Sequence, residues 1–254
     1  MNRWVALNSS SVSALRPSRA LTAGYAPEHS TPQLNAPGSS DLTVYNDVVT
    51  FSSSVRQVAS ADFPTRWGQF RIYGFEGIFG IGEDQRKEEA VALVTGDIHS
   101  APPLVRIHSQ CLTGDVFGSL RCDCRQQLEM ALSMIADQGA GVLLYEQQEG
   151  RGIGLMAKLQ AYELQDAGLD TVEANERLGF KADHRAFTLP AEMLKALGIH
   201  EVRLLSNNPD KVAALEQAGV TVVERVPCEV AASPHAEDYL KTKKEKLGHL
   251  FTSR

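Results

Sequence analysis

Three of the four cysteines of this chain, Cys111, Cys122 and Cys124, fall within fourteen consecutive residues. Structural zinc sites are usually closed by four protein ligands, whereas catalytic sites keep one position for water or substrate. The cluster therefore predicts a zinc site that does chemistry, with reduced buried thiols and a disulfide as the alternatives. If the segment is extended, Cys122 and Cys124 point to the same side, and the loop from Cys111 folds back to join them.

A cation and an imidazole precede the first cysteine, in the run R-I-H-S-Q-C that ends at Cys111. The imidazole of His108 is a candidate for a fourth zinc ligand. On an extended segment, however, a side chain three positions before Cys111 points to the opposite face. The spacing therefore favours a hydrogen-bonding or structural role for His108.

A glycine-rich segment, Y-E-Q-Q-E-G-R-G-I-G at residues 145–154, follows an apolar run and precedes a helical pattern. Glycines at such a strand end let backbone N–H groups approach a phosphate, and Arg151 adds positive charge. A plain turn between a strand and a helix needs the same glycines. The segment matches neither the P-loop nor the dinucleotide-binding pattern, so by itself it is weak evidence.

Two further segments carry charged side chains beside expected strand ends. Asp183 and Arg185 are two residues apart and face the same side of an extended chain, where a surface ion pair is the simplest interpretation. In S-N-N-P-D-K, Asn208 is placed to cap a helix that begins with proline. Such a helix start can hold a phosphate with help from Lys211, although many helix caps bind nothing.

The elements that must position these residues fall into two patterns. Residues 68–75, 89–94 and 104–108 are β-like runs without helical periodicity, and they predict a β meander. Strands are then expected at 142–145, 202–205 and 220–223, alternating with helices near 128–135, 155–162, 191–197, 211–218 and 237–250. The predicted fold class is α/β, with an α+β-like N-terminal meander followed by alternating strands and helices in one domain at 61–254.

Residues 1–60 are rich in Ser, Ala, Thr and Pro and are expected to form a disordered leader, with regular structure beginning near Phe63. Residues 42–55 contain apolar and β-branched side chains and are a candidate strand. The leader has arginines but no acidic residue before Glu28, which also fits an organellar transit peptide.

Composition excludes several classes of protein. The chain has 254 residues, 43% of them apolar, which suffices for a substantial core. No apolar run is long enough to span a membrane, and no secretion signal is present, so we expect a reducing, cytoplasmic location. A net charge of −6 and a pI near 5.7 argue against nucleic acid as a partner.

Taken together, R-I-H-S-Q-C-L-T-G-D-V-F-G-S-L-R-C-D-C, Q-E-G-R-G-I-G-L, Q-D-A-G-L-D-T-V-E-A-N, L-G-F-K-A-D-H-R and R-L-L-S-N-N-P-D-K closely resemble GTP cyclohydrolase II. That family opens GTP at the start of riboflavin synthesis. The resemblance runs from about Phe63 to the C-terminus, about three quarters of the chain.

The resemblance implies one zinc ion per subunit on the three clustered cysteines, activating water for attack at C8 of guanine. Formate and pyrophosphate leave, and the product is 2,5-diamino-6-hydroxy-4-(5-phosphoribosylamino)pyrimidine. Tyr162 is placed at the ring-opening site, Asp183 at the position of a proton acceptor and Arg185 at that of a nucleophile toward the α-phosphorus. Because a guanidinium is normally protonated, stabilising charge on the α-phosphate is the physically easier role for Arg185.

The same resemblance implies a substrate-binding set, Mg²⁺ on the triphosphate of GTP and a homodimer. The residues of that set are Arg106, Ile107, His108, Ser109, Gln110, Gln127, Glu149, Gly150, Arg151, Thr171, Ser206 and Lys211.

Three positions depart from the family pattern, which has Glu at Gln110, Gly at Arg125 and Thr at Ser206. Gln110 and Arg125 change the charge near the metal, so a paralogue that stops at the formylated intermediate or prefers another purine nucleotide is one alternative. A non-catalytic, zinc-stabilised nucleotide-binding protein is another, disfavoured by the retained catalytic set. The acidic net charge disfavours a zinc nucleic-acid module.

Overall fold

The computed structural model describes residues 53–80, 85–230 and 236–251. Most of the expected leader, and most of the candidate strand at 42–55, lie outside these residues. Regular structure begins earlier than expected, because strand β1 (Ser53–Thr65) starts ten residues before Phe63. β1 pairs with β2 (Gly68–Phe79) along its whole length, and backbone pairing of this kind does not require an apolar sequence.

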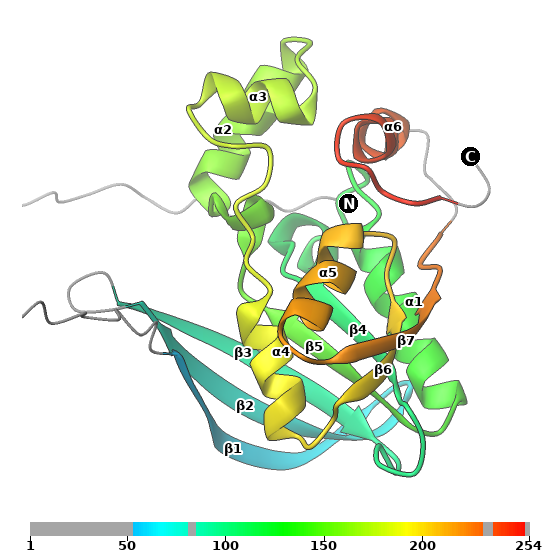
Figure 1. Ribbon diagram of the computed structural model, residues 1–254. Coiled ribbons are helices and arrows are strands. Elements are labelled where there is room, and N and C mark those ends of the chain that lie inside the picture. The colour runs from blue at the N-terminus through cyan, green and yellow to red at the C-terminus, as the bar shows by residue number, and fades with distance from the viewer. Residues whose placement is uncertain (1–52, 81–84, 231–235, 252–254) are drawn as a thin grey trace, which may run out of the picture. The chain divides into compact units, whose positions relative to one another are not determined.

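The described strands form one mixed sheet in the order β1-β2-β3-β5-β4-β6-β7 (Figure 1). β1, β2, β3 (Arg86–Thr95) and β5 (Gly141–Glu146) are antiparallel neighbours. β4 (Leu104–Ser109), β6 (Glu201–Leu205) and β7 (Thr221–Val226) extend the sheet beside β5 in parallel. The expected meander is therefore wrong for residues 104–108, which belong to the parallel half.

The parallel strands β4 and β5 read L-V-R-I-H-S and G-V-L-L-Y-E and are buried along most of their length. Parallel strands covered on both faces carry such continuous apolar runs. Val105, Ile107 and Leu144 face one core cluster, whereas Leu104 and Leu143 face the other. The alternation of side chains along each strand thus fills both layers.

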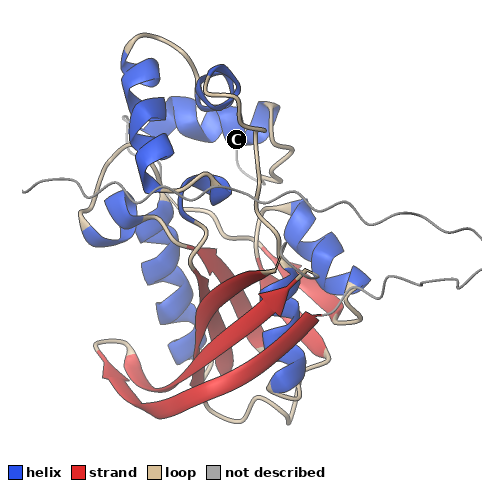
Figure 2. Cartoon of the chain, turned by 90° about the vertical axis from the view of Figure 1, so that its left-hand side faces the viewer, coloured by secondary structure: helices blue, strands red, loops and turns tan. Residues whose placement is uncertain are grey.

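Helices cover both faces of this half of the sheet (Figure 2). α1 (Cys124–Asp137) packs its Leu132 and Ile135 on one face. α4 (Thr188–Ala196) and α5 (Pro209–Gln217) cover the other face, with Met193 and Leu215 in the core. These elements confirm the expected α/β alternation, with bounds shifted by a few residues.

Three further helices complete the described part of the chain: α2 (Leu155–Asp166), α3 (Thr171–Arg177) and α6 (Glu237–Glu245). α3 contacts both α2 and α6. α3 was not predicted from the sequence. Asp170 and Glu173 nevertheless form a capping box, which is a sequence pattern that marks the start of a helix. No helix among the described residues is long and apolar enough to cross a membrane.

Candidate active site

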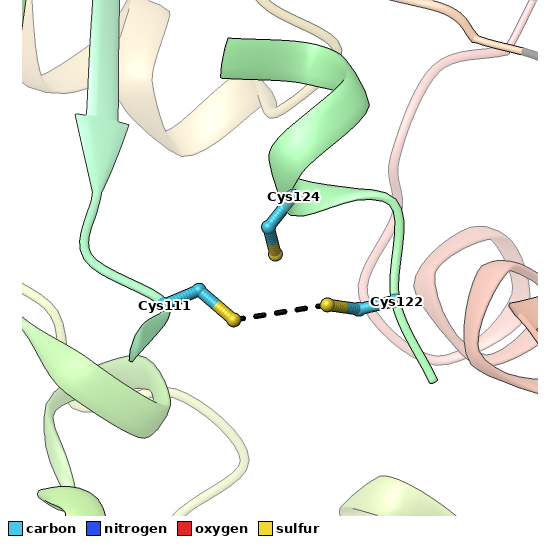
Figure 3. A group of neighbouring side chains, drawn as sticks. All are labelled: Cys111, Cys122 and Cys124. Atoms are coloured by element: carbon cyan, nitrogen blue, oxygen red, sulfur yellow. Dashed lines mark hydrogen bonds between the residues drawn. The ribbon is translucent and has the colours of Figure 1, made fainter. Parts of the chain in front are cut away.

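The three cysteines converge beyond the carboxyl end of β4, at the turn that leads into α1. Cys111 follows β4, Cys122 lies in the turn, and Cys124 is the first residue of α1. Their Sγ atoms all lie within 4.8 Å of one another, and Figure 3 shows the side chains pointing into one space. The expected extended segment is wrong, because the start of the helix brings Cys124 toward Cys122. We call these three thiols the sulfur cluster.

The spacing of the sulfur atoms separates the alternatives left open by the sequence. Sγ of Cys111 lies 3.7 Å from Sγ of Cys122, and all three cysteines are free. Two thiolates on a tetrahedral zinc ion, each about 2.3 Å from the metal, are about 3.8 Å apart. A disulfide requires about 2.05 Å. The geometry therefore fits zinc and disfavours a disulfide.

A small residue keeps the space between the thiols open. Gly114 lies in a π-helical turn, Leu112–Val116, and a Cβ at this position would come within 2.9 Å of the Cys122 Sγ and 3.1 Å of the Cys111 Sγ. Its backbone φ is not in the left-handed region, so space and not conformation requires glycine here. A cradle of this size, lined by three soft donors, suits a zinc ion.

A buried cation compensates the sulfur cluster. Nζ of Lys158, on α2, lies 3.2 Å from the Cys111 Sγ and 2.6 Å from Oε1 of Glu149. Hydrogen bonds from Cys122 and Cys124, together with the charge of Lys158, hold the pKa of Cys111 well below its ordinary value. Burial opposes the charge of Lys158, but the Cys111 thiolate and Glu149 raise the pKa of its ammonium. Cys111 is thus prepared as a thiolate.

His108 belongs to a hydrogen-bond network beside the cluster. Its Nε2 lies 3.1 Å from Oδ2 of Asp115, which also accepts from the backbone N–H of Cys111 and the hydroxyl of Tyr145. Burial lowers the pKa of His108. Among the described residues the grouping with metal-ligand geometry contains the three cysteines and no histidine. The structure therefore places His108 in a role that orients the loop bearing Cys111.

A pocket that is partly open to solvent lies against the sulfur cluster. Of the residues expected to bind substrate, only Ile107 does not line it, because its side chain is fully buried in the core. The lining members of the expected set are Arg106, His108, Ser109, Gln110, Gln127, Glu149, Gly150, Arg151, Thr171, Ser206 and Lys211. Tyr162 and Arg185 also line it, whereas Asp183 does not. Segments far apart in sequence thus meet at one cavity, above the carboxyl ends of the parallel strands.

Arg151 is held in the pocket in an unusual backbone conformation. Gly150 and Arg151 have φ values of 61° and 60°, and for Arg151 this left-handed conformation carries strain. Nη1 and Nη2 of Arg151 are buried without a hydrogen-bond partner in the described structure. A buried guanidinium with unsatisfied donors is suited to an anionic ligand.

Arg185 and Lys211 bring two more basic side chains to the pocket, and burial, together with the charges of Arg106 and Arg185, holds the pKa of Lys211 well below its ordinary value. The guanidinium of Arg185 is held by Asp183 through Nη2 to Oδ2 at 2.5 Å and Nε to both carboxylate oxygens. Burial opposes its charge, but the ion pair with Asp183 raises the pKa of Arg185. Nζ of Lys211 donates to the backbone carbonyl of Ile107 at 2.8 Å, which gives Ile107 a backbone role.

Tyr162, on α2, connects the pocket to the sulfur cluster. Its hydroxyl lies 3.1 Å from Oγ1 of Thr113, which in turn lies 3.7 Å from the Cys111 Sγ. The guanidinium of Arg121 stacks over the ring at 4.8 Å. Burial raises the pKa of Tyr162, so its phenol stays protonated at neutral pH and can donate a proton.

The positions that depart from the family pattern lie in different surroundings. The side chain of Gln110 lines the pocket, and its backbone N–H donates to the carbonyl of Glu146. Ser206 also lines the pocket and its Oγ accepts from the backbone N–H of Asn208. Arg125 is partly exposed, pairs with Glu129 along α1 and does not line the pocket. Of the two positions at which the charge departs from the family pattern, only Gln110 lines the pocket.

Several residues that line the pocket were not predicted from the sequence: Arg121, Lys158, Tyr239, Lys243 and His249. Lys158, Tyr239 and Lys243 lie on helices whose sequences carry no motif beyond an amphipathic pattern. Arg121 lies within the cysteine motif, but nothing in its spacing marks it as a pocket residue, and His249 follows α6. Lys158 is 47 residues from its partner Cys111 in the sequence, and Lys243 is 120 residues from its partner Asp123. Their positions in the site therefore depend on tertiary packing.

Comparison with known proteins gives a family. The model of the GTP cyclohydrolase II family matches residues 56–227. The chain is 57% identical over 198 residues to GTP cyclohydrolase-2 of Escherichia coli (strain HS) and of Shigella boydii serotype 18. That region covers 78% of this chain and 98% of each relative.

Among solved structures, a two-domain 3,4-dihydroxy-2-butanone 4-phosphate synthase from A. baumannii matches 60% of this chain and 34% of its own, at 19% identity and a TM-score of 0.31. That likeness is too weak to support an argument. The family model and the relatives matched over nearly their whole length are sufficient: the chain belongs to the GTP cyclohydrolase II family, and it is an enzyme of that class, as its motifs predict.

Proposed function

We propose that this enzyme hydrolyses GTP in the first step of riboflavin biosynthesis, opening the imidazole ring of guanine and releasing formate and pyrophosphate. The observation that carries this proposal is one pocket that contains both a three-thiol metal cradle and buried cations with unsatisfied donors. The family relatives named GTP cyclohydrolase-2 support the choice of substrate.

The sulfur cluster is suited to hold one Zn²⁺, which when bound by Cys111, Cys122 and Cys124 would supply an activated water at neutral pH. Lys158 and Asp115 orient Cys111, through its Sγ and its backbone N–H respectively. Tyr162 lies beside this cradle with a protonated phenol. We assign it the delivery of a proton to the purine ring as the C8–N bond breaks.

The triphosphate is placed against Arg151, Arg185 and Lys211. The unsatisfied Nη atoms of Arg151 provide two donors to phosphate oxygens. Mg²⁺ bound to the triphosphate would lower the remaining negative charge, as is usual for nucleotide substrates. We include Mg²⁺ in the proposed reaction on this chemical ground.

Arg185 is proposed to stabilise negative charge at the α-phosphate. Its ion pair with Asp183 raises its pKa, so the guanidinium stays protonated and is a poor nucleophile. The same ion pair lowers the pKa of Asp183 despite its burial. Since Asp183 does not line the pocket, the geometry supports a positioning role for its carboxylate, holding Arg185 toward substrate.

The residues expected to bind substrate surround the nucleotide, with the backbone of Ile107 acting through Lys211. The family resemblance supports a homodimer, and free cysteines in the site support a reducing cytoplasmic location.

The proposal is tested by incubating the purified protein with GTP, Zn²⁺ and Mg²⁺ and quantifying formate, pyrophosphate and the pyrimidine product. Equimolar formate and pyrophosphate are expected. Pyrophosphate without formate, together with a formylated product, would favour the paralogue that stops at the intermediate, for which Gln110 is the structural reason. A Cys111→Ser protein serves as the control that reports reaction without the metal site.

A further inference from the structure

The C-terminal part of the chain reaches the metal site. The family model ends at residue 227, ten residues before α6 begins. Nevertheless Tyr239 and Lys243 of α6, and His249 after it, line the pocket that contains the sulfur cluster. Leu250 is tied down by its backbone N–H, which donates to the carbonyl of Asn207. Figure 3 shows the red ribbon of this segment beside the turn that carries Cys122.

One ion pair connects α6 to the sulfur cluster. Nζ of Lys243 lies 2.7 Å from Oδ1 of Asp123, the residue between Cys122 and Cys124. The two side chains retain only 10% and 4% of their accessible surface. A buried carboxylate without a compensating charge is strongly unfavourable. Lys243 is therefore the partner that allows a negative charge to be buried between two metal ligands.

The side chain of Asp123 does not cap the helix at whose start it lies. It is the N-cap residue of α1, and aspartate at that position normally accepts a backbone N–H of its own helix. Here the side chain makes no capping hydrogen bond. Its oxygens instead accept from Lys243 and, at 2.6 Å, from Nε2 of Gln127. The carboxylate is thus turned away from the helix end and toward α6.

The consequence concerns the geometry of the two neighbouring ligands. Asp123 shares its backbone with Cys122 and Cys124, so fixing its side chain restrains the peptide units from which both thiols project. Gln127 extends the restraint, because its Oε1 accepts from Nη2 of Arg106 at 2.7 Å. Groups that orient metal ligands in this way commonly affect metal affinity 10- to 100-fold, on the order of the effect of a weak ligand.

We propose that Lys243 is a positioning residue for the metal centre: through Asp123 it holds Cys122 and Cys124 in the arrangement that binds zinc. The segment after residue 227, where the family model ends, is thereby part of the working site. This inference rests on the zinc site of the proposed function, and it assigns no contact between Lys243 and substrate.

The test measures zinc affinity by competition with a chromophoric chelator, in the absence of GTP. Lys243→Met is expected to weaken zinc binding by about 10- to 100-fold. The exposed Lys241 on the same helix provides the matched control, Lys241→Met, which should bind zinc as the wild type does. Lys243→Arg, which keeps the charge, should recover most of the affinity. With Co²⁺ as probe, Lys243→Met should also show an altered thiolate-to-metal absorption band, which a general loss of stability would not produce.

Removal of Lys243 leaves the buried Asp123 without its charge partner. The single variant is therefore compared with the double variant Asp123→Asn/Lys243→Met, which leaves no uncompensated buried charge at this pair. In that double variant the fold should be retained while zinc binding stays weak. Wild-type zinc affinity and an unchanged Co²⁺ spectrum in either variant would overturn this inference alone. A wild-type protein that binds no zinc would overturn the proposed function as well, so the two failures are distinguishable.

Discussion

The sulfur cluster and the cations of the same pocket are assembled in opposite ways. The three thiols come from fourteen consecutive residues around one turn. The cation group, Arg151, Arg185 and Lys211, comes from three separate segments of the chain. One local turn supplies all three thiols, with Lys243 of α6 paired to Asp123 in that turn, whereas the cation group exists only when distant parts of the α/β layer are in place.

The electrostatics of the two groups differ accordingly. The negative charge of the sulfur cluster is compensated by Lys158, which contacts Cys111, and the space beside Gly114 can hold a metal ion. In the cation group Asp183 is the partner of Arg185, but the Nη atoms of Arg151 have no hydrogen-bond partner in the described structure. One group is built to hold a cation and the other to hold an anion. Variants that act on one group and spare the other therefore test this division.

The largest effect is expected at the sulfur cluster. Replacing Cys111, Cys122 or Cys124 individually by serine removes one of three ligands, so zinc content and formate release should both fall to background. Cys228→Ser is the matched control, because Cys228 is buried but lies outside the cluster. Metal analysis and a formate assay on each protein measure the outcome. Full zinc occupancy with activity in any of the three variants would refute the ligand assignment.

The next effect separates the two halves of the reaction. Tyr162→Phe removes the protonated phenol beside the metal cradle while leaving the cation group untouched. Formate release should slow by about 10²- to 10⁴-fold, the usual range for a positioned proton donor. Pyrophosphate release should be affected much less, and single-turnover measurement of both products reports the ratio.

Arg185→Ala is the counterpart of that variant, because it removes a cation beside the phosphates and leaves the sulfur cluster intact. This variant should lower the rate of pyrophosphate release, whereas its zinc content should change less. If Tyr162→Phe and Arg185→Ala impaired both products in the same proportion, the division of the pocket into two functional groups would be wrong.

A smaller effect is expected when the metal cradle is partly filled. Gly114→Ala places a methyl group 2.9 Å from the Cys122 Sγ, at a backbone conformation that alanine tolerates. Zinc affinity should fall by about 10-fold or more, while the melting temperature of the metal-free protein hardly changes. Chelator competition and thermal unfolding decide the matter. Unchanged zinc affinity would mean that the cradle is not where the metal binds.

The same contrast explains what the sequence could predict. Cysteine spacing is a local pattern, so the three thiols could be named as candidate metal ligands before the structure, and the apolar periodicities predicted most helices and strands. β1 was assigned largely to a leader because its residues, S-S-V-R-Q-V-A-S-A-D-F-P-T, have few apolar positions. Its pairing with β2 depends on a neighbouring strand and not on its own composition.

Residues 104–108 illustrate a second limit. Their apolar character indicated a strand, but it did not say that β5, from beyond α1, would lie between them and β3. Lys158, Lys243 and Asp123 illustrate a third, since a single charged residue on a helix has no signal for burial. The family resemblance supplied the proposed substrate-binding residues, which local patterns had left as alternatives.

A pH effect on stability tests the charge of the cation group. Burial, together with Lys243, Arg185, Arg151 and Lys211, lowers the pKa of His249 from 6.5 to about 3. Below pH 6.5 the unfolded chain therefore binds a proton that the folded protein does not, and stability falls as the pH decreases toward 3. His249→Gln should reduce this dependence, whereas the exposed His200→Gln should not. Urea unfolding between pH 7.5 and 5 measures the difference, and equal slopes in all three proteins would contradict the prediction.

The smallest effect is expected from the N-terminal side, because none of the described residues before Arg106 lines the pocket. The region that matches 98% of the Escherichia coli relative is only 78% of this chain, so part of the chain has no counterpart there. Deletion of residues 1–52 keeps all of β1 and should leave kcat/KM, zinc content and melting temperature unchanged. Deletion of residues 1–60 removes the part of β1 that pairs with Tyr73–Phe79 and uncovers the core beside Val55. That protein should lose about 5 °C or more in melting temperature while keeping its zinc. Loss of activity in the shorter deletion would show that the residues before β1 support the pocket, and that neither group of the site is independent of them.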